Sequence, residues 1–226
     1  MEWLGAVAVV SLALVVALAT AVLTPAVLLA LPTPADAVSS PYRRLASPGF
    51  RLAVFVTCLT ACLIAFTYTP RTHWFAWLAL AVPCVVGALV DARTTYLPLP
   101  LARAGWLLAA VGACALAIVT LSWTPLPGAA LGATVVGGFL WVFWRFTGGF
   151  GFGDVRLAAT IGAVTALTSL SLSFASLLIG CLIGAVWGIV HRTRVGSGPF
   201  PYGPSLLAGP FVALPLLSLT GGLQLF

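Results

Sequence analysis

The chain has 226 residues, of which 62% are hydrophobic and only 6% are charged. A soluble domain carries about 25% charged residues, so this composition excludes an ordinary water-facing surface. A helix needs about 20 apolar residues to cross a bilayer, so eight helices would use about 160 residues and leave only short loops. We therefore expect one transmembrane domain over residues 1–226, with the lipid bilayer around it and no second, soluble domain.

The net charge of +6 comes from ten arginines and no lysine, against four acidic residues. Cytoplasmic loops of membrane proteins collect basic residues, so the charge indicates membrane topology and no nucleic-acid partner is expected. The five cysteines lie in apolar stretches, and no two have the C-x-x-C spacing of a zinc or redox site. Neither a disulfide framework, a metal nor a cofactor is expected. The cysteines are Cys58, Cys62, Cys84, Cys114 and Cys181.

Proline, glycine and charged residues divide the chain into eight apolar segments. The first is longer than the apolar region of a signal peptide, about 7–15 residues, so it is expected to be a retained span. Ser171 to Ser173, between the sixth and seventh segments, is the weakest boundary. The sequence predicts an all-α integral membrane protein, a polytopic bundle of about eight transmembrane helices. The segments are 3–31, 52–68, 74–90, 104–122, 128–144, 154–170, 174–190 and 205–222.

The arginines are distributed unevenly between the two sides of the membrane that this division implies. Nine lie in or beside the loops 32–51, 91–103, 145–154 and 191–204, whereas Arg71 lies on the opposite side. This asymmetry places the arginine-rich side in the cytoplasm and both termini outside. The nine are Arg43, Arg44, Arg51, Arg93, Arg103, Arg145, Arg156, Arg192 and Arg194.

Asp91 and Asp154 are the only carboxylates in the membrane-spanning region, since Glu2 is terminal and Asp36 lies in a polar loop. Asp91 is expected to end the third span and Asp154 to begin the sixth, both at the cytoplasmic edge. Asp154 could be a helix N-cap, and Asp91 could be a snorkelling or Arg93-paired helix end. Their occurrence at one depth favours a functional pair, because ionisable residues inside a bilayer are costly.

Two carboxyl groups held close together cannot easily both ionise, so one keeps a proton while the other is charged. The ionised group can take a proton from water, and the protonated group can donate to a scissile carbonyl oxygen. The pair can therefore hydrolyse a peptide bond without a metal. His73 is expected on the outer side, away from the acids, and neither G-x-S-x-G nor H-E-x-x-H occurs.

Three motifs resemble those of prepilin peptidases, also called type IV leader peptidases. Gly151-Phe152-Gly153-Asp154, followed by Val155-Arg156-Leu157, is similar to the family's G-x-G-D-(V/F)-K-L pattern. Residues 91–98, Asp-Ala-Arg-Thr-Thr-Tyr-Leu-Pro, are similar to its D-x-x-x-x-x-(I/L)-P segment. Residues 199–209 are similar to its P-F-G-P-x-L-x-x-G element. The motifs occur in family order on one predicted membrane side, and the resemblance covers about residues 74–210, the expected peptidase core.

The resemblance implies a bacterial plasma-membrane aspartic endopeptidase in which Asp91 and Asp154 are the catalytic pair. Its implied partners are pilin-like precursors with a short basic leader, a cleavage point usually after glycine, and an apolar helix beginning next to it. The other residues of the motifs would bind substrate or shape the site. They are Gly151, Gly153, Arg156, Pro98, Pro201, Gly203 and Pro204.

The chain departs from the family pattern in three places. Leu99 follows Pro98 where many members have aspartate, and Arg156 replaces the usual lysine but keeps its charge. The loop 32–51 lacks the paired cysteines of the methyltransferase domain that many members carry there, so no methyltransferase activity is expected. Alternatives are an ion- or proton-coupled transporter, a protease like presenilin or signal peptide peptidase, and a catalytically silent membrane scaffold.

Overall fold

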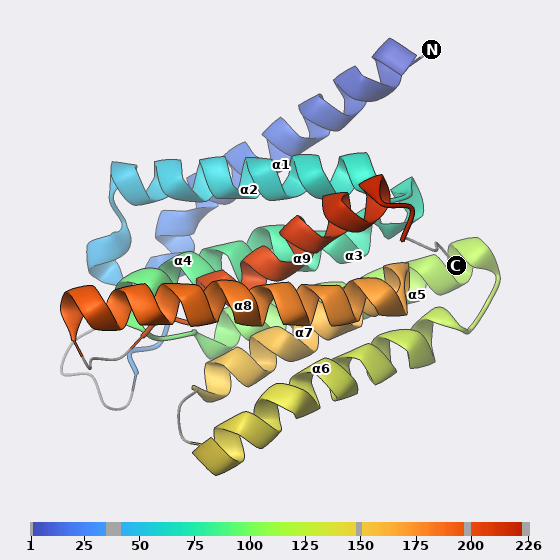
Figure 1. Ribbon diagram of the computed structural model, residues 1–226. Coiled ribbons are helices and arrows are strands. Elements are labelled where there is room, and N and C mark those ends of the chain that lie inside the picture. The colour runs from blue at the N-terminus through green and yellow to red at the C-terminus, as the bar shows by residue number, and fades with distance from the viewer. Residues whose placement is uncertain (1, 35–41, 148–150, 197–199, 223–226) are drawn as a thin grey trace.

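The computed structural model describes residues 2–34, 42–147, 151–196 and 200–222, and every regular element in these ranges is a helix. The helices α3, η3 and α4 follow one another without a break, so the described residues form eight long helical units (Figure 1). Two short 3-10 turns, η1 (Arg43–Leu45) and η2 (Arg71–His73), precede α2 and α3. The other elements are α1 (Glu2–Ala30), α2 (Pro48–Tyr68), α3 (Trp74–Ala79), η3 (Leu80–Cys84), α4 (Val85–Thr94), α5 (Leu99–Thr120), α6 (Pro125–Thr147), α7 (Phe152–Thr168), α8 (Leu170–Val195) and α9 (Gly203–Leu219).

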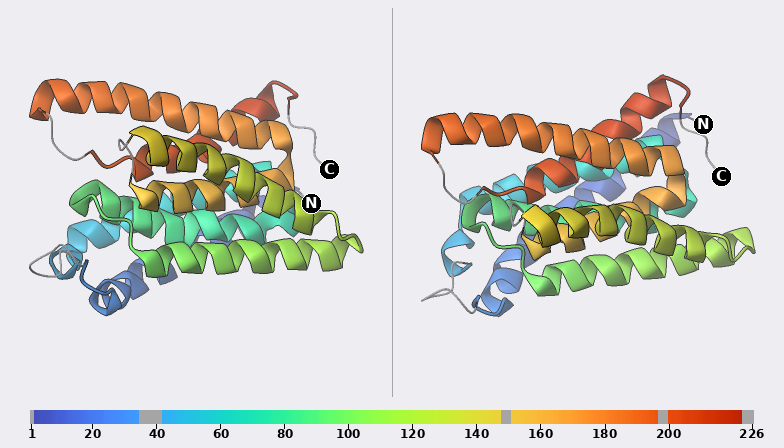
Figure 2. Two further views of the ribbon diagram at one scale, coloured as in Figure 1. Left: turned by 90° about the horizontal axis from the view of Figure 1, so that it is seen from below. Right: turned by 60° about the horizontal axis from the view of Figure 1, so that its bottom comes forward.

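Successive helical units run in opposite directions, so the connections alternate between two ends of the bundle (Figures 1 and 2). The connections after α1, α4, α6 and α8 lie at one end, which carries nine of the ten arginines and is called here the arginine-rich end. Both chain termini lie toward the other end, as Figure 2 also shows. Arg71 is there too, since a Cβ on Gly5 near the start of α1 would lie 3.9 Å from its Nη2 atom.

The surface and interior of the bundle are those of a multi-pass membrane protein. Exposed leucine, valine and phenylalanine side chains cover the outer faces of α1, α5, α6 and α8. Six helical units are long and apolar enough to cross a membrane, whereas α7 and α9 have only 17 residues each. Seventeen residues is about the shortest length that spans the hydrocarbon core. The polytopic helical fold is therefore confirmed, and length and composition identify six of the eight expected spans.

Glycines allow neighbouring helices to pack with their backbones in contact. A Cβ on Gly132 of α6 would overlap the carbonyl oxygen of Gly162 of α7, and the reverse holds for Gly162. On α8, Gly180, Gly184 and Gly188 recur every four residues and receive the backbone of α9, the Tyr202 ring and the Phe200 ring. Small residues at such positions let membrane helices associate through close van der Waals contact.

Two predicted boundaries are wrong. Asp91 does not end its helix, because α4 continues for nearly one more turn to Thr94 and stops where Thr95 adopts a left-handed φ of 57°. Residues 171–173 belong to α8 rather than to a turn. The break lies at Ser169, whose extended backbone ends α7 and whose hydroxyl caps α8 by accepting a hydrogen bond from the Leu172 amide (3.1 Å). Serine serves this capping role well because its side-chain oxygen replaces a missing helical acceptor.

Trp77 anchors the α3–α4 unit to the far end of α7. Its side chain is fully buried, and its indole Nε1 donates a hydrogen bond to the Thr168 hydroxyl (3.2 Å). Next to it, His73 Nε2 lies 3.0 Å from the carbonyl oxygen of Leu167. His73 thus lies at the end of α7 opposite Asp154, as the sequence predicts. Between Trp77 and Asp91 the helix widens into the π-helical turn η3, which contains Pro83.

Candidate active site

Asp91 lies on α4 at the arginine-rich end, with only 5% of its surface exposed. Its Oδ2 atom accepts a hydrogen bond from the backbone N–H of Gly203, the first residue of α9 (2.9 Å). An unsatisfied N–H at a helix N-terminus is a favourable partner for a carboxylate. Arg93, by contrast, is exposed. Asp91 is therefore held inside the bundle by α9, and the interpretation of a helix end that reaches out to Arg93 does not fit its burial.

Asp154 lies in the first turn of α7, with 7% of its surface exposed. Its Oδ2 atom accepts a hydrogen bond from the backbone N–H of Gly151 (3.1 Å), and the Asp154 amide donates to the Gly151 carbonyl oxygen (3.0 Å). The N-cap of α7 is therefore Gly151, and Asp154 is its third helical residue. The N-cap interpretation of Asp154 is wrong in position, although the carboxylate does satisfy an amide at the helix start.

The fold brings these two carboxyl groups together from helices that are far apart in the sequence. Helix α9 packs against both α4 and α7, and Asp91 lies within electrostatic range of Asp154. The two groups are buried at the same end of the bundle, and each is fixed by one backbone N–H from a glycine. Like charges in a poorly solvated site repel each other strongly, which favours the sharing of one proton between the two carboxyl groups.

The predicted glycines and prolines lie in or beside the segments that carry or bind the two acids. Gly153 and Gly203 lack the Cβ atoms that would collide with Leu97, and for Gly203 also with Asp91 Oδ2 at 2.9 Å. Pro98 is buried and caps the start of α5, where its carbonyl oxygen accepts hydrogen bonds from Leu101 and Ala102. Pro201 and Pro204 are half-buried on either side of the Tyr202–Gly203 pair. Gly148 and Gly149, which precede the G-x-G-D motif in the sequence, lie outside the described residues.

Arg156 is the predicted site residue that the structure does not bring to the acids. Its guanidinium lies 4.7 Å from the centroid of the Phe152 ring, and that ring packs against Trp144 of α6. Its carbonyl oxygen accepts a hydrogen bond from Trp106 Nε1 of α5 (3.2 Å). Residues two apart on a helix point to nearly opposite faces, so Asp154 and Arg156 diverge.

Two residues at the site were missed by sequence reasoning. Leu97 contacts glycines on three helices, and the Tyr202 ring covers Gly184 of α8. The Tyr202 hydroxyl donates a hydrogen bond to the Cys181 carbonyl oxygen (3.5 Å), and the ring is within electrostatic range of Asp154. A signal for Tyr202 was present: it precedes Gly203 within the third motif, and Gly184 belongs to the four-residue glycine spacing of α8.

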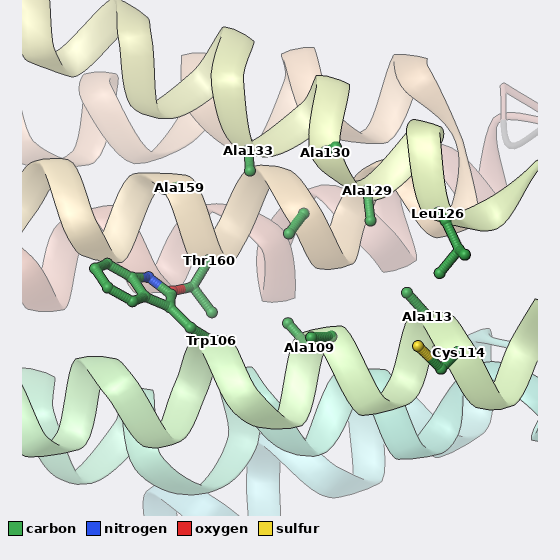
Figure 3. Close-up of a pocket in the computed structure, with 12 residues that line it drawn as sticks. Trp106, Ala109, Ala113, Cys114, Leu126, Ala129, Ala130, Ala133, Ala159 and Thr160 are labelled. Carbon is green, nitrogen blue, oxygen red and sulfur yellow. The ribbon is translucent and has the colours of Figure 1, made fainter.

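Among the apolar grooves between the described helices, one is lined in part by α7 and another by α9. The first, of about 380 Å³, separates α5 from α6 over α7, and Figure 3 shows Trp106 and Thr160 at one end of it and Cys114 at the other. Alanines line most of this groove, and neither Asp91 nor Asp154 does. The second, of about 300 Å³, lies between α2, α4 and α9, with Pro204 among its lining residues. It therefore adjoins Gly203, the residue that holds Asp91.

Comparison with protein families agrees with this arrangement. Residues 72–189 match the model of the "Type IV leader peptidase family", which is slightly more than half of the chain. The chain belongs to the type IV leader peptidase family. The matched region begins before α3 and contains both Asp91 and Asp154. The resemblance inferred from the three motifs is therefore confirmed at the level of the family.

Individual relatives carry the name "Prepilin leader peptidase/N-methyltransferase". The protein of Aeromonas salmonicida (strain A449) is 31% identical over 181 residues, and that of Aeromonas hydrophila is 31% identical over 177 residues. Each match covers 74% of this chain and 58% of the relative, so the chain spans less than two thirds of their length. A Pseudomonas aeruginosa relative is 33% identical over 92 residues, 38% of this chain and 31% of the relative. No solved structure matches.

Proposed function

We propose that this protein is a membrane aspartic endopeptidase that removes the leader peptide of pilin-like precursors at the cytoplasmic face of a bacterial plasma membrane. The observation that carries the proposal is the pair of buried carboxyl groups, Asp91 and Asp154, held together at one end of the bundle. Family membership and the printed names of the relatives support the same reaction. A transporter is less well supported, because transporter sites usually lie near the middle of the bilayer.

The proposed chemistry is general acid–base hydrolysis. One carboxylate removes a proton from a water molecule, which then attacks the scissile carbonyl carbon. The partner, still protonated, donates its proton to the carbonyl oxygen. As the C–N bond then breaks, the first carboxyl group gives the proton it took from water to the amine nitrogen, and the partner takes back a proton from a hydroxyl group of the tetrahedral intermediate. The Gly203 and Gly151 amides keep both side chains in place while the proton moves. Neither a metal nor a cofactor takes part in these steps.

The proposed topology has eight spans, with both termini outside and the acid pair near the cytoplasmic surface. Nine arginines at the end of the bundle that holds Asp91 and Asp154 support this orientation, since positive residues are retained in the cytoplasm. A precursor whose apolar helix lies in the bilayer would present the bond next to that helix at the same depth. Its basic leader would remain on the cytoplasmic side.

The proposed activity is proteolysis without methylation, within one transmembrane domain whose core is residues 74–210. The segment between α1 and α2 has no cysteine, whereas the methyltransferase domain of the family carries paired C-x-x-C motifs at that place. If the purified protein transferred a methyl group from S-adenosylmethionine to a processed pilin peptide, this part of the proposal would be wrong.

The test is cleavage of a precursor by the purified protein in lipid nanodiscs. The substrate is a peptide with a short basic leader, a glycine and an apolar helix, and the products are identified by mass spectrometry. We expect one cut next to the apolar helix with wild type and none with Asp91→Asn/Asp154→Asn. If the wild-type protein left the precursor intact and carried an ion flux in proteoliposomes, the peptidase proposal would be wrong and a transporter function would be supported.

Gly203→Ala is expected to lower the rate of cleavage by about tenfold or more, because small displacements of catalytic groups have effects of this size. The added Cβ would lie 2.9 Å from Asp91 Oδ2 and 3.1 Å from Leu97, so the carboxylate must move. The matched control is Gly128→Ala near the start of α6, where nothing lies within 4 Å of the added atom. Equal rates for the two variants would contradict the role given to Gly203.

A further inference from the structure

Leu97 occupies a central place between the helices that carry the acid pair. It lies in the short connection between α4 and α5, and its side chain is half-buried against three glycines. A Cβ on Gly153 would lie 2.6 Å from Leu97 Cβ, one on Gly203 would lie 3.1 Å from its Cδ1, and one on Gly87 would lie 3.3 Å from its Cδ2. One side chain therefore contacts α7, α9 and α4 at once.

Each of these glycines is close to one of the two acids in the sequence or binds it. Gly153 immediately precedes Asp154, and the amide of Gly203 donates the hydrogen bond to Asp91. Gly87 lies four residues before Asp91, on the same face of α4. The contacts of Leu97 thus connect the backbone that carries Asp154 to the backbone that holds Asp91.

The backbone around Leu97 fixes the direction of this side chain. Thr95 has a left-handed φ of 57°, and its amide donates to the Asp91 carbonyl oxygen (2.7 Å), so the chain turns back directly after α4. Pro98 follows, and a residue before proline is restricted to extended conformations. The buried Pro98 then starts α5. Leu97 consequently has little freedom to move away from the three glycines.

We propose that Leu97 is a positioning residue that sets the distance and orientation between the Asp91 and Asp154 carboxyl groups. This inference rests on the proposed function, and it gives Leu97 a role that acts through the backbone segments that carry and bind the acids. Leucine suits the role because it fills the space between the helix backbones and has no polar group that could form a hydrogen bond with the carboxyl groups. Removing its Cγ and Cδ atoms leaves α7 and α9 free to shift toward the gap, and a shift of about 1 Å can lower a rate by about 100-fold.

The test compares Leu97→Ala, Leu97→Ile and the control Leu107→Ala, whose side chain on α5 is 65% exposed. The proteins are studied in nanodiscs with the basic-leader precursor peptide. For Leu97→Ala we expect a fall in kcat of about 10- to 100-fold with KM changed less than about threefold, because the acids move but substrate binding remains. Leu97→Ile should restore most of kcat, and Leu107→Ala should match wild type. An unchanged kcat in Leu97→Ala, or an isoleucine variant as slow as the alanine variant, would overturn the proposal.

Hydrogen exchange of backbone amides distinguishes a failure of this inference from a failure of the proposed function. In Leu97→Ala the amides of Gly151 and Gly203, which bind the acids, should exchange at least several-fold faster, whereas amides in the middle of α6 should keep the wild-type rate. If wild type cleaves no precursor but exchange changes in this way, the proposed function fails and the positioning role stands. If wild type cleaves and neither kcat nor exchange responds, the positioning role alone fails.

Discussion

Asp91→Asn and Asp154→Asn are each expected to slow cleavage by about 10²- to 10⁴-fold, the range that general acid–base catalysis contributes. Asparagine has nearly the same shape and keeps an oxygen that can accept the hydrogen bond from Gly203 or Gly151. It cannot gain or lose a proton as a carboxyl group does. The expected loss therefore affects the chemical step and lowers kcat, whereas KM should change little. Initial rates with a saturating precursor peptide measure it.

The two carboxyl groups should behave as one unit. The double variant Asp91→Asn/Asp154→Asn is expected to be no slower than either single variant, because removal of one proton carrier already disables the pair. The control is Asp36→Asn, which removes a carboxylate of the same type that precedes α2 in the sequence and lies outside the described residues. Cleavage at the wild-type rate by either single variant, with folding intact, would rule out the mechanism. Losses in the two single variants that multiply would indicate that the acids act separately.

Gly132→Ala is expected to lower the stability of the protein. Its Cβ would overlap the Gly162 carbonyl oxygen and press on Ala166, so α6 and α7 would have to separate. Overpacking of this kind costs about 1–3 kcal/mol or more. In a chain of this size each kcal/mol lowers Tm by about 2–4 °C, so a fall of about 5 °C is expected. Thermal unfolding in nanodiscs, followed by tryptophan fluorescence, measures the change.

A control in the same helix should shift in the opposite direction. Gly138→Ala places its Cβ where nothing lies within 4 Å. Alanine is more favourable than glycine inside a helix by about 1 kcal/mol, so its Tm should stay equal or rise slightly. Similar Tm values for Gly132→Ala and Gly138→Ala would show that the α6–α7 backbone contact does not limit stability.

The eight helical segments could be predicted because a membrane protein separates apolar spans sharply from charged loops. The arginine distribution also predicted which connections share one end of the bundle, and the structure places them together. From this, Asp91 and Asp154 were expected at the same depth, and both lie at the arginine-rich end. The three motifs in family order then led to the family, which the comparison confirms.

Details that depend on packing between helices could not be read from the sequence. Apolar residues surround these helices on all sides, so hydrophobic periodicity does not reveal which face is buried. Leu97 stands at the (I/L)-P position of the second motif, but only the fold shows that it lies against glycines from three helices. Arg156 was assigned to the site from its place in a motif, but the helical rotation after Asp154 directs it toward Phe152. The sequence does not show that α4 continues to Thr94, because the charged residues Asp91 and Arg93 mark the edge of the apolar segment and not the end of the helix.

The hydrogen bond between Trp77 and Thr168 joins the α3–α4 unit to the end of α7 that lies far from Asp154. The number of residues between this contact and each acid therefore affects how Asp91 and Asp154 are placed relative to each other. Fourteen residues separate Trp77 from Asp91, and fourteen separate Asp154 from Thr168 on the antiparallel helix. At 1.5 Å per α-helical residue the stretch on α7 measures about 21 Å. The stretch from Trp77 to Asp91 has the same number of residues but includes the π-helical turn η3. Exchanges of one apolar residue for another leave the lengths of these two stretches unchanged. An insertion or a deletion in only one of them would shift Asp91 relative to Asp154 along the helix axes.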